Sequence, residues 1–361
     1  MQAVILAGGR GERLQPLTAR LPKPLVPFFD RPLLGLLLDH LAGQGVEEAF
    51  VTTGYLGAAI TRFASRPRRG IRVHVVQEER ALGTAGAVAA LAPALHSPFL
   101  VVSGDAVLDL DLGGLLAAHR RAAAAATLCT APAADRLRFG VAVLRDGLVA
   151  GFAEKPALEQ VAPGMAVNAG CYLLETGALE AAGRHPSPDF GRDVFPSMLE
   201  AGARIGAAPA LRFWRDIGTP AAYREAQLDA LAGDWPWEVP ASAQPFHVGS
   251  GADLVGPVHL GPGVHIGRGA HIVGPVYLGA GATVGDHAVV VRSVLLPGAE
   301  IGTGTRLQDC VVDAHVSVPG GLAFGAALVG AAPARPVRSA VAAAPAPTPA
   351  ATPAPAVAVL G

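Results

Sequence analysis

Residues 254–284 read LVGPVHLGPGVHIGRGAHIVGPVYLGAGATV, and an apolar residue returns there at every sixth position. The period starts at Val248 and continues through Leu254, Leu260, Ile266, Ile272, Leu278 and Val284. It then slips by one residue and resumes at Val289, Leu295, Ile301 and Leu307. A six-residue period fits neither an amphipathic helix nor a hairpin meander. It is typical of a left-handed parallel β-helix with apolar residues inside a triangular prism, which we predict over residues 247–330.

The sequence changes character on both sides of this repeat. Before it, residues 233–246 contain Asp234-Trp235-Pro236-Trp237 and Pro240, which predicts a linker that packs locally. After it, residues 331–361 consist mainly of alanine, proline and threonine. Such a composition cannot bury enough apolar surface to offset the entropy of ordering the chain, so we expect a disordered tail.

The first 232 residues alternate short apolar runs with stretches of helical spacing. Strands are expected at Val4–Ala7, Ala49–Thr53, Val73–Val76 and Phe99–Ser103, and helices at Pro32–Leu41, Leu56–Phe63 and Thr84–Leu91. This order predicts a doubly wound, Rossmann-like α/β domain with a mixed, mostly parallel sheet. Ligands of such folds bind beyond the carboxyl ends of the strands. A Gly-rich turn and Gly104-Asp105 fall at two of these ends.

Composition argues against several classes of protein. The formal charge of −1 and the pI near 6.8 offer no electrostatic basis for binding nucleic acid or an acidic membrane surface. No apolar run reaches the ~20 residues of a membrane-spanning helix, and the first residues lack signal-peptide features. The three cysteines, Cys129, Cys171 and Cys310, lack metal-ligand spacing and are interpreted as buried side chains in a reducing compartment. We expect a soluble, cytoplasmic protein.

Lysine occurs only at Lys23 and Lys155, each directly before a proline, and the remaining basic residues of the 28 are arginine. Lysine offers a compact, rotatable charge and arginine a planar fork, so the two are not interchangeable at a crowded anion site. A GC-rich coding bias that spared two surface lysines is the alternative explanation. The motifs around the two lysines favour a functional role.

The first motif follows the first expected strand and reads Leu6-Ala7-Gly8-Gly9-Arg10-Gly11-Glu12-Arg13-Leu14, continuing to Pro22-Lys23-Pro24-Leu25. Its three glycines let backbone N–H groups approach a phosphate, and Arg13 and Lys23 add two cations. It matches neither the dinucleotide-binding motif nor the P-loop. A plain strand-to-helix turn is the alternative, but it does not account for Arg13 and the Pro-Lys-Pro sequence.

These motifs resemble the signature of the sugar-nucleotide pyrophosphorylases, which make an NDP-sugar and pyrophosphate from an NTP and a sugar 1-phosphate. The resemblance covers residues 1–230 and continues, in order, through Leu82-Gly83-Thr84-Ala85-Gly86, Gly104-Asp105, Phe139-Gly140-Val141, Glu154-Lys155-Pro156, Asn168-Ala169-Gly170 and Trp214-Arg215-Asp216-Ile217-Gly218-Thr219-Pro220. With the hexapeptide domain, these motifs are most similar to the mannose-1-phosphate guanylyltransferases. Thymidylyl- and uridylyltransferases acting on glucose 1-phosphate share most of them.

The resemblance implies a role for each motif. It places the nucleotide on Leu6, Ala7, Gly8, Gly9, Gly11, Gln77, Gly83 and Thr84, and the sugar phosphate on Gly140, Glu154, Lys155 and Asn168. The implied catalytic residues are Arg13 for pyrophosphate, Lys23 for the triphosphate, Lys155 for the sugar phosphate, and Asp105 and Asp216 for Mg²⁺. Magnesium prefers one or two carboxylates plus substrate phosphates. A turn or helix cap is the alternative for both aspartates.

Four further expectations concern a departure from the family pattern, two alternative functions and the assembly. Ser103 stands two positions before Asp105, where the family often has Asn, which leaves the contacts of the metal site open. His259, His265 and His271 share one hexad phase and suggest a surface ladder, which disfavours the acyltransferase activity of some β-helix proteins. A catalytically silent regulatory subunit is a further alternative. The β-helix also suggests a homo-oligomer.

Overall fold

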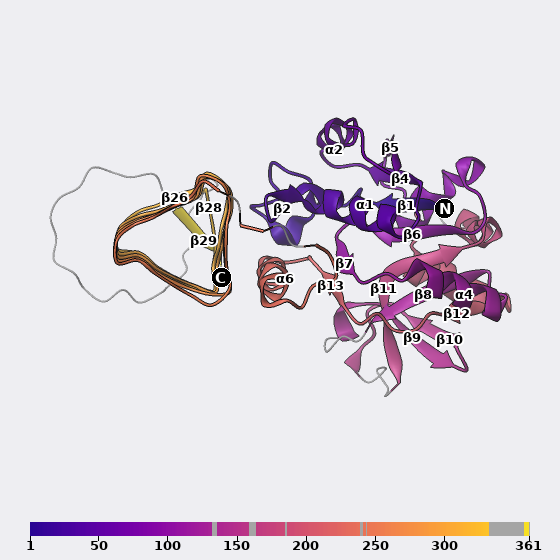
Figure 1. The fold of residues 1–361 in the computed structure, drawn as a ribbon. Helices are drawn as coiled ribbons and strands as arrows, with labels where there is room; N and C mark the ends of the chain where they lie inside the picture. The colour runs from indigo at the N-terminus through magenta and orange to yellow at the C-terminus, as the bar shows by residue number, and fades with distance from the viewer. Residues whose placement is uncertain are drawn as a thin grey trace. The chain divides into compact units, whose positions relative to one another are not determined.

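The computed structural model describes residues 1–131, 136–158, 164–184, 186–238, 241–242, 244–331 and 357–360. These residues form two compact units (Figure 1). The first comprises Met1–Gly11, Leu21–Val26 and Pro32–Asp216, and the second comprises Glu12–Arg20, Pro27–Arg31 and the chain from Ile217 onward. Within the described ranges, no helix combines the length and the apolar character needed to cross a membrane.

A nine-stranded sheet forms the centre of the first unit, in the order β5-β4-β1-β6-β11-β8-β12-β10-β9. The strands β5, β4, β1 and β6 pair in parallel, whereas β11 and β10 run antiparallel to their neighbours. The mixed, mostly parallel sheet predicted from the sequence is therefore confirmed. The strands are β1 (Gln2–Leu6), β4 (Glu48–Thr53), β5 (Arg72–Gln77), β6 (Phe99–Ser103), β8 (Ala126–Ala131), β9 (Val141–Arg145), β10 (Leu148–Ala153), β11 (Met165–Leu174) and β12 (Ile205–Ala207).

Helices cover both faces of this sheet. Successive residues of a strand point to opposite sides, so neighbouring residues of one strand contact helices on different faces. On β8, the hydroxyl of Thr127 lies 2.8 Å from Nδ1 of His119 in α4. The next residue, Leu128, joins the core on the other face with Val88 of α3 and Phe195 of α5. The helices of this unit are α1 (Leu33–Gly43), α2 (Gly57–Ala64), α3 (Thr84–Ala89), α4 (Leu112–Ala122) and α5 (Phe195–Glu200).

One predicted strand differs from the expectation of burial on both faces. β5 lies at the edge of the sheet, and its residues alternate between exposed and half-buried. An edge strand has only one neighbour and less cover, so an apolar run such as Val73–Val76 does not by itself distinguish an edge from a central position.

The second unit is built on three stacked parallel sheets. Each coil contributes one strand to each sheet (Figure 1). The apolar side chains pack inside. This confirms the hexapeptide β-helix. Its strands are β14 (His247–Val248), β17 (His265–Ile266), β20 (Thr283–Val284), β23 (Glu300–Ile301) and β26 (Ser317–Val318) in one sheet; β15 (Asp253–Val255), β18 (His271–Val273), β21 (Val289–Val291), β24 (Arg306–Gln308) and β27 (Ala323–Gly325) in the next; and β16 (Val258–Leu260), β19 (Val276–Leu278), β22 (Val294–Leu295), β25 (Val311–Val312) and β28 (Leu328–Ala331) in the third.

The register slip of the repeat lies later than predicted. Val290, not Val289, points inward, since it is 0% exposed and pairs with Ile272 of the coil before. The repeat after this strand is one residue shorter than six, and the residue is lacking at the corner that follows the strand. Gly-Pro pairs at 256–257 and 274–275 form this corner in the first coils. Later coils instead use one residue with positive φ, Arg292 at 44° and Asp309 at 54°, which shortens the corner by a residue.

The outer face of the third sheet is apolar and covered. Its outward residues His259, Tyr277, Val294, Val311 and Leu328 are all at most 5% exposed. The hydroxyl of Tyr277 donates a hydrogen bond to Asp30, and the backbone N–H of Ala280 donates to the same carboxylate at 3.1 Å. Helix α6 (Pro220–Ala232) lies along β19. These contacts explain why residues 27–31 and 217–232, which we expected in a domain ending at residue 232, group with the β-helix.

The predicted histidine ladder is wrong. His259 and His265 share a hexad phase but lie in different sheets, because successive hexads occupy successive faces of the prism. His259 is buried and stacks on Tyr277, with ring centroids 5.3 Å apart. The ring next to His265 belongs to His247, 18 residues earlier, at 4.6 Å.

The linker and the tail are described only in part. Trp235, in the predicted linker, stacks on Phe28 with ring centroids 4.7 Å apart and meets Trp237 edge to face at 5.5 Å. Most of the predicted disordered tail, residues 332–356 and 361, lies outside the described residues. Val357–Leu360 instead form β29, antiparallel to β28. Its Val-Ala-Val-Leu sequence favours a strand, which the composition of the whole tail conceals.

Candidate active site

The carboxyl ends of three adjacent strands form the base of the candidate site. The backbone N–H of Ala7, the residue after β1, donates a hydrogen bond to the carbonyl oxygen of Thr52 in β4, at 3.0 Å. Gly104 N donates to Leu6 O at 2.9 Å, so the end of β6 lies beside β1. A Cβ atom on Gly104 would lie 2.9 Å from that carbonyl oxygen, which requires glycine there. The Gly-rich turn and Asp105 are thus brought together as predicted.

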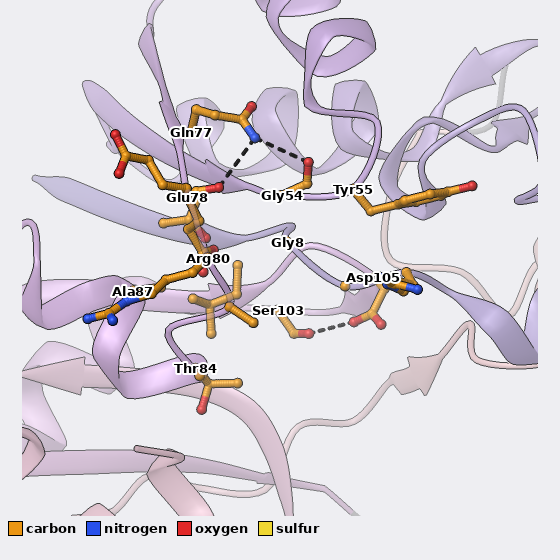
Figure 2. A pocket seen from close by; sticks show the side chains of 17 residues that line it. Gly8, Gly54, Tyr55, Gln77, Glu78, Arg80, Thr84, Ala87, Ser103 and Asp105 are labelled. Carbon is orange, nitrogen blue, oxygen red and sulfur yellow. Dashed lines mark hydrogen bonds between the residues drawn. The ribbon is translucent and has the colours of Figure 1, made fainter. Parts of the chain in front are cut away.

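A cavity of about 770 Å³ opens at this edge of the sheet (Figure 2). Six of the predicted nucleotide-binding residues line it, whereas Ala7 and Gly11 do not. The lining residues are Leu6, Gly8, Gly9, Arg10, Thr52, Gly54, Tyr55, Gln77, Glu78, Glu79, Arg80, Ala81, Gly83, Thr84, Ala87, Ser103 and Asp105. Arg10, Tyr55 and Arg80 also line the cavity, although no sequence motif assigned them a role. Arg10 could have been selected from the sequence, because it lies inside the Gly-rich motif.

Lys23 meets both predicted metal-binding carboxylates. Its ammonium contacts the carboxylate of Asp105 and lies 3.5 Å from Oδ1 of Asp216. The Lys23 side chain is only 10% exposed. Burial alone would raise the pKa of Asp105, but the charge of Lys23 and the hydrogen bonds from Lys23 and Ser103 hold it below its ordinary value. Asp105 is therefore ionised at neutral pH.

A separate two-stranded sheet of β7 (Ala106–Leu108) and β13 (Trp214–Asp216) brings Asp216 to this place. The two strands are antiparallel, with Asp216 opposite Ala106. Asp105 and Asp216 therefore emerge side by side although more than a hundred residues separate them. Two carboxylates form a hard oxygen donor set that suits Mg²⁺ completed by phosphate oxygens. The residues present thus fit the implied metal.

Ser103, which stands where the family often has asparagine, contacts the neighbouring carboxylate. Its hydroxyl donates a hydrogen bond to Oδ1 of Asp105 (Figure 2). Serine can therefore orient this carboxylate with a shorter side chain than the asparagine that is often found there.

Glu78 lies close to the Gly-rich turn. A Cβ atom on Gly8 would be 2.7 Å from Oε1 of Glu78, and Oε2 accepts the N–H of Leu82 at 3.2 Å. Gln77 turns its amide to the carbonyl of Gly54, at 3.2 Å (Figure 2). The carboxylate of Glu78 is thus held beside the Gly-rich turn.

Two glycines enclose the carboxylate of Glu154, which follows β10. A Cβ atom on either Gly140 or Gly191 would lie 2.6 Å from its Oε2. Burial raises the pKa of Glu154 above its ordinary value, and the nearby Asp189 raises it further against the opposing charges of Lys155 and Arg192. Gly191 belongs to no motif that the sequence analysis recognised.

Lys155 and Asn168 differ in how much of each side chain is available to a ligand. Lys155 is 67% exposed, and its Nζ lies 3.5 Å from Glu154. Asn168 accepts the N–H of Gly170 at 3.1 Å and donates to the hydroxyl of Tyr172 at 2.8 Å. These two bonds hold the irregular stretch of β11 between Asn168 and Tyr172, where the pairing with β8 shifts register.

Arg13 is the one predicted catalytic residue outside the first unit. It lies exposed in the short 3₁₀ helix η1 (Glu12–Leu14), which groups with the β-helix unit. Its role on pyrophosphate stays a prediction.

A Gly-rich turn, a lysine and two carboxylates thus meet at the carboxyl edge of the α/β sheet. The chain belongs to the nucleotidyl transferase family, whose profile matches residues 2–233. A second profile, the GlmU-like C-terminal hexapeptide, matches residues 258–331. The family resemblance of the sequence motifs is therefore confirmed.

Several characterised relatives resemble this chain over much of its length. A mannose-1-phosphate guanylyltransferase of Mycobacterium tuberculosis is 33% identical over 328 residues, covering 89% of this chain and 82% of the relative. A mannose-1-phosphate guanylyltransferase catalytic subunit beta of Danio rerio is 32% identical, covering 88% and 87%. A UTP–glucose-1-phosphate uridylyltransferase of Synechocystis is 32% identical, covering 64% of each chain.

Proposed function

We propose that this protein transfers the nucleotidyl group of an NTP to a sugar 1-phosphate and releases pyrophosphate. The observation that carries the proposal is the convergence of Lys23, Asp105 and Asp216 beside the Gly-rich cavity. The names of the relatives support sugar 1-phosphates as acceptors. GTP and mannose 1-phosphate are our proposed substrates.

In this reaction a phosphate oxygen of the sugar 1-phosphate forms a bond to the α-phosphorus of the NTP. The bond from that phosphorus to the bridging oxygen breaks, and pyrophosphate leaves with the electron pair. The attacking oxygen is already an anion, so no general base is needed. Catalysis therefore depends on positioning and on neutralising negative charge.

The residues of the site divide this work between the two substrates. The backbone of the Gly-rich turn and the ammonium of Lys23 hold the triphosphate, with Arg13 assigned to the departing pyrophosphate. Asp105 and Asp216 would hold Mg²⁺, which would supply charge neutralisation on the phosphates when bound. The exposed Lys155 guides the sugar phosphate, and Glu154 accepts hydrogen bonds from sugar hydroxyls.

Glu78 supports guanine as the base. A carboxylate offers only acceptors, and guanine presents two adjacent donors, N1–H and the 2-amino group, on its Watson–Crick edge. Uracil and thymine present a single donor between two carbonyl oxygens, which a carboxylate repels. A uridylyl- or thymidylyltransferase acting on glucose 1-phosphate is the second candidate, and the Synechocystis relative favours it.

One assay matrix tests the proposal. Pyrophosphate release is measured with each of the four NTPs against mannose, glucose and other sugar 1-phosphates. We expect the highest kcat/KM for GTP with mannose 1-phosphate. Turnover with UTP and glucose 1-phosphate instead would support the second candidate. No turnover with any pair would contradict the enzyme and favour a regulatory subunit that only binds nucleotide-sugars.

The assembly is a separate proposal. We expect a homo-oligomer formed through the β-helix, where Val255 and Val273 expose apolar surface on neighbouring strands. Light scattering of the purified protein measures its mass. A monomer across the micromolar range would contradict this expectation.

A further inference from the structure

The backbone of residues 187–190 packs closely on the loop that begins α3. The carbonyl oxygen of Pro188 accepts the N–H groups of Ala85 at 3.0 Å and of Gly86 at 3.4 Å. Gly83 has a φ of +76°, and a Cβ atom there would lie 2.4 Å from the same oxygen. The loop at 83–86 lines the cavity at Gly83 and Thr84, so its position is set partly by Pro188.

The hydroxyl of Thr84 makes two hydrogen bonds in this contact. It donates to Oδ2 of Asp189 at 2.7 Å and accepts the N–H of Phe190 at 3.0 Å. A hydroxyl has a single hydrogen to donate, so Thr84 gives its hydrogen to Asp189 rather than to a ligand. We predicted Thr84 as a nucleotide-binding residue, and these bonds suggest that it acts by fixing the loop.

Asp189 also orders the segment on its other side. Its Oδ1 accepts the N–H groups of Gly191 at 2.9 Å and of Arg192 at 3.1 Å, which caps η7 (Phe190–Val194). Gly191 is one of the two glycines that enclose the Glu154 carboxylate. One carboxylate therefore connects the cavity-lining loop with the wall around Glu154.

We propose that Asp189 is a positioning residue that couples the two substrate sites through its hydrogen bond to Thr84. A nucleotide that orders the loop at 83–86 also orders Gly191 beside Glu154, so it strengthens the binding of the sugar phosphate. By linkage, the sugar phosphate strengthens nucleotide binding by the same factor. This inference rests on the proposed function, which assigns the two ligands.

The first test measures the coupling directly. Calorimetry gives the Kd of mannose 1-phosphate with and without saturating GTP in which a methylene group bridges the α- and β-phosphorus, so that no reaction follows. We expect the nucleotide to lower this Kd about tenfold in the wild type, within the usual range of coupling. Thr84→Val and Asp189→Ala should reduce the factor to about one. Coupling that persists in both variants overturns the proposal.

A matched control separates coupling from loss of a helix cap. Asp111 caps α4 by accepting the N–H of Gly114 at 2.9 Å, and it lines no part of the cavity. Asp111→Ala should cost similar stability and leave the coupling factor unchanged. An equal loss of coupling in Asp111→Ala would show that the effect is general destabilisation, which contradicts the assigned role.

The second test does not depend on activity or on ligands. Hydrogen exchange of the Ala85 and Gly86 amides reports their bonds to Pro188. Thr84→Val should speed their exchange about tenfold or more, while Thr84→Ser, which keeps the hydroxyl, should restore protection. Unchanged exchange in Thr84→Val overturns the proposal even if both ligands bind. If the wild type binds neither ligand, the proposed function fails, and the exchange data still decide whether the contact orders the loop.

Discussion

The ammonium group of Lys23 contacts the carboxylate of Asp105, although 82 positions separate the two residues in the chain. The same Nζ lies 3.5 Å from Asp216, 193 positions away. Lysine is thus placed between two carboxylates where little room remains for a larger cation. This position gives a physical reason why residue 23 is a lysine in a chain whose basic residues are otherwise almost all arginine.

Replacing Lys23 tests its role. Lys23→Ala should abolish pyrophosphate release, and Lys23→Arg should lower kcat about 100-fold, because the planar guanidinium displaces reacting groups by roughly an ångström. Far-UV circular dichroism should stay native in both. Arg268→Ala, which removes an exposed ion pair with Asp286 on the β-helix, serves as the control and should keep full activity. Near-normal turnover of Lys23→Ala would contradict the assignment of Lys23 to the triphosphate.

The stability should depend on pH through Asp105. Its pKa is held below the ordinary value of about 3.9, so its stabilising contribution is complete above that pH and is lost as pH falls through the lower, folded-state pKa. In Lys23→Met the positive charge is gone, so burial raises the pKa of Asp105 above its ordinary value. Ionisation of Asp105 then destabilises the folded state. The difference in urea-unfolding free energy between the two proteins should therefore grow from about pH 3 to 6. A constant difference would contradict the ion pair.

The pKa of Glu154 should respond to Asp189. Burial and the Asp189 charge both raise it, so Glu154 contributes stability at low pH that is lost as pH rises through its folded-state pKa. Asp189→Asn removes the charge and should lower the pKa of Glu154 in a carboxyl ¹³C NMR titration. The control is Glu48, whose pKa is lowered chiefly by a hydrogen bond from Gln2 and should not move. An unchanged Glu154 would exclude the interaction.

Tyr277→Phe should destabilise the second unit. Tyr277 is 0% exposed, and its loss would deprive the Asp30 carboxylate of one hydrogen bond. Removing one partner from a fully buried polar group costs about 1–3 kcal/mol, and the half-buried Asp30, which keeps the N–H of Ala280, should fall at the low end of this range. Thermal unfolding should therefore begin at lower temperature. Asp286→Asn, at an exposed ion pair, should change little, and an equal effect of both substitutions would refute the argument.

Glu78→Gln tests the choice of base. The amide keeps an acceptor for Leu82 N–H but loses one of two acceptors for guanine. We expect kcat/KM for GTP to fall about 10- to 100-fold, the worth of a bidentate base contact, with UTP much less affected. Glu47→Gln, outside the cavity lining, is the control. A parallel loss for both nucleotides would indicate a structural role for Glu78.

Much of the architecture was readable from local patterns. The apolar runs at Ala49–Thr53 and Phe99–Ser103 became β4 and β6, and the hexads became the β-helix, because short-range periodicity directly reflects which side chains face a core. The pattern failed where it was locally degenerate. In the run Val289–Val291 every residue is apolar, and only the pairing of Val290 with its neighbours selects the inward side chain.

The motifs by themselves determined the family, the two compact folds and the short segments that carry the chemistry, since each is contiguous in the chain. Only the tertiary structure decided which side chains meet. Lys23 reaches Asp216 because β13 pairs with β7, and Thr84 reaches Asp189 across more than a hundred residues. Asp30 likewise finds Tyr277 on the β-helix. Such contacts follow from long-range packing, which satisfies a buried polar group with any partner the fold brings near and leaves no periodic trace in the sequence.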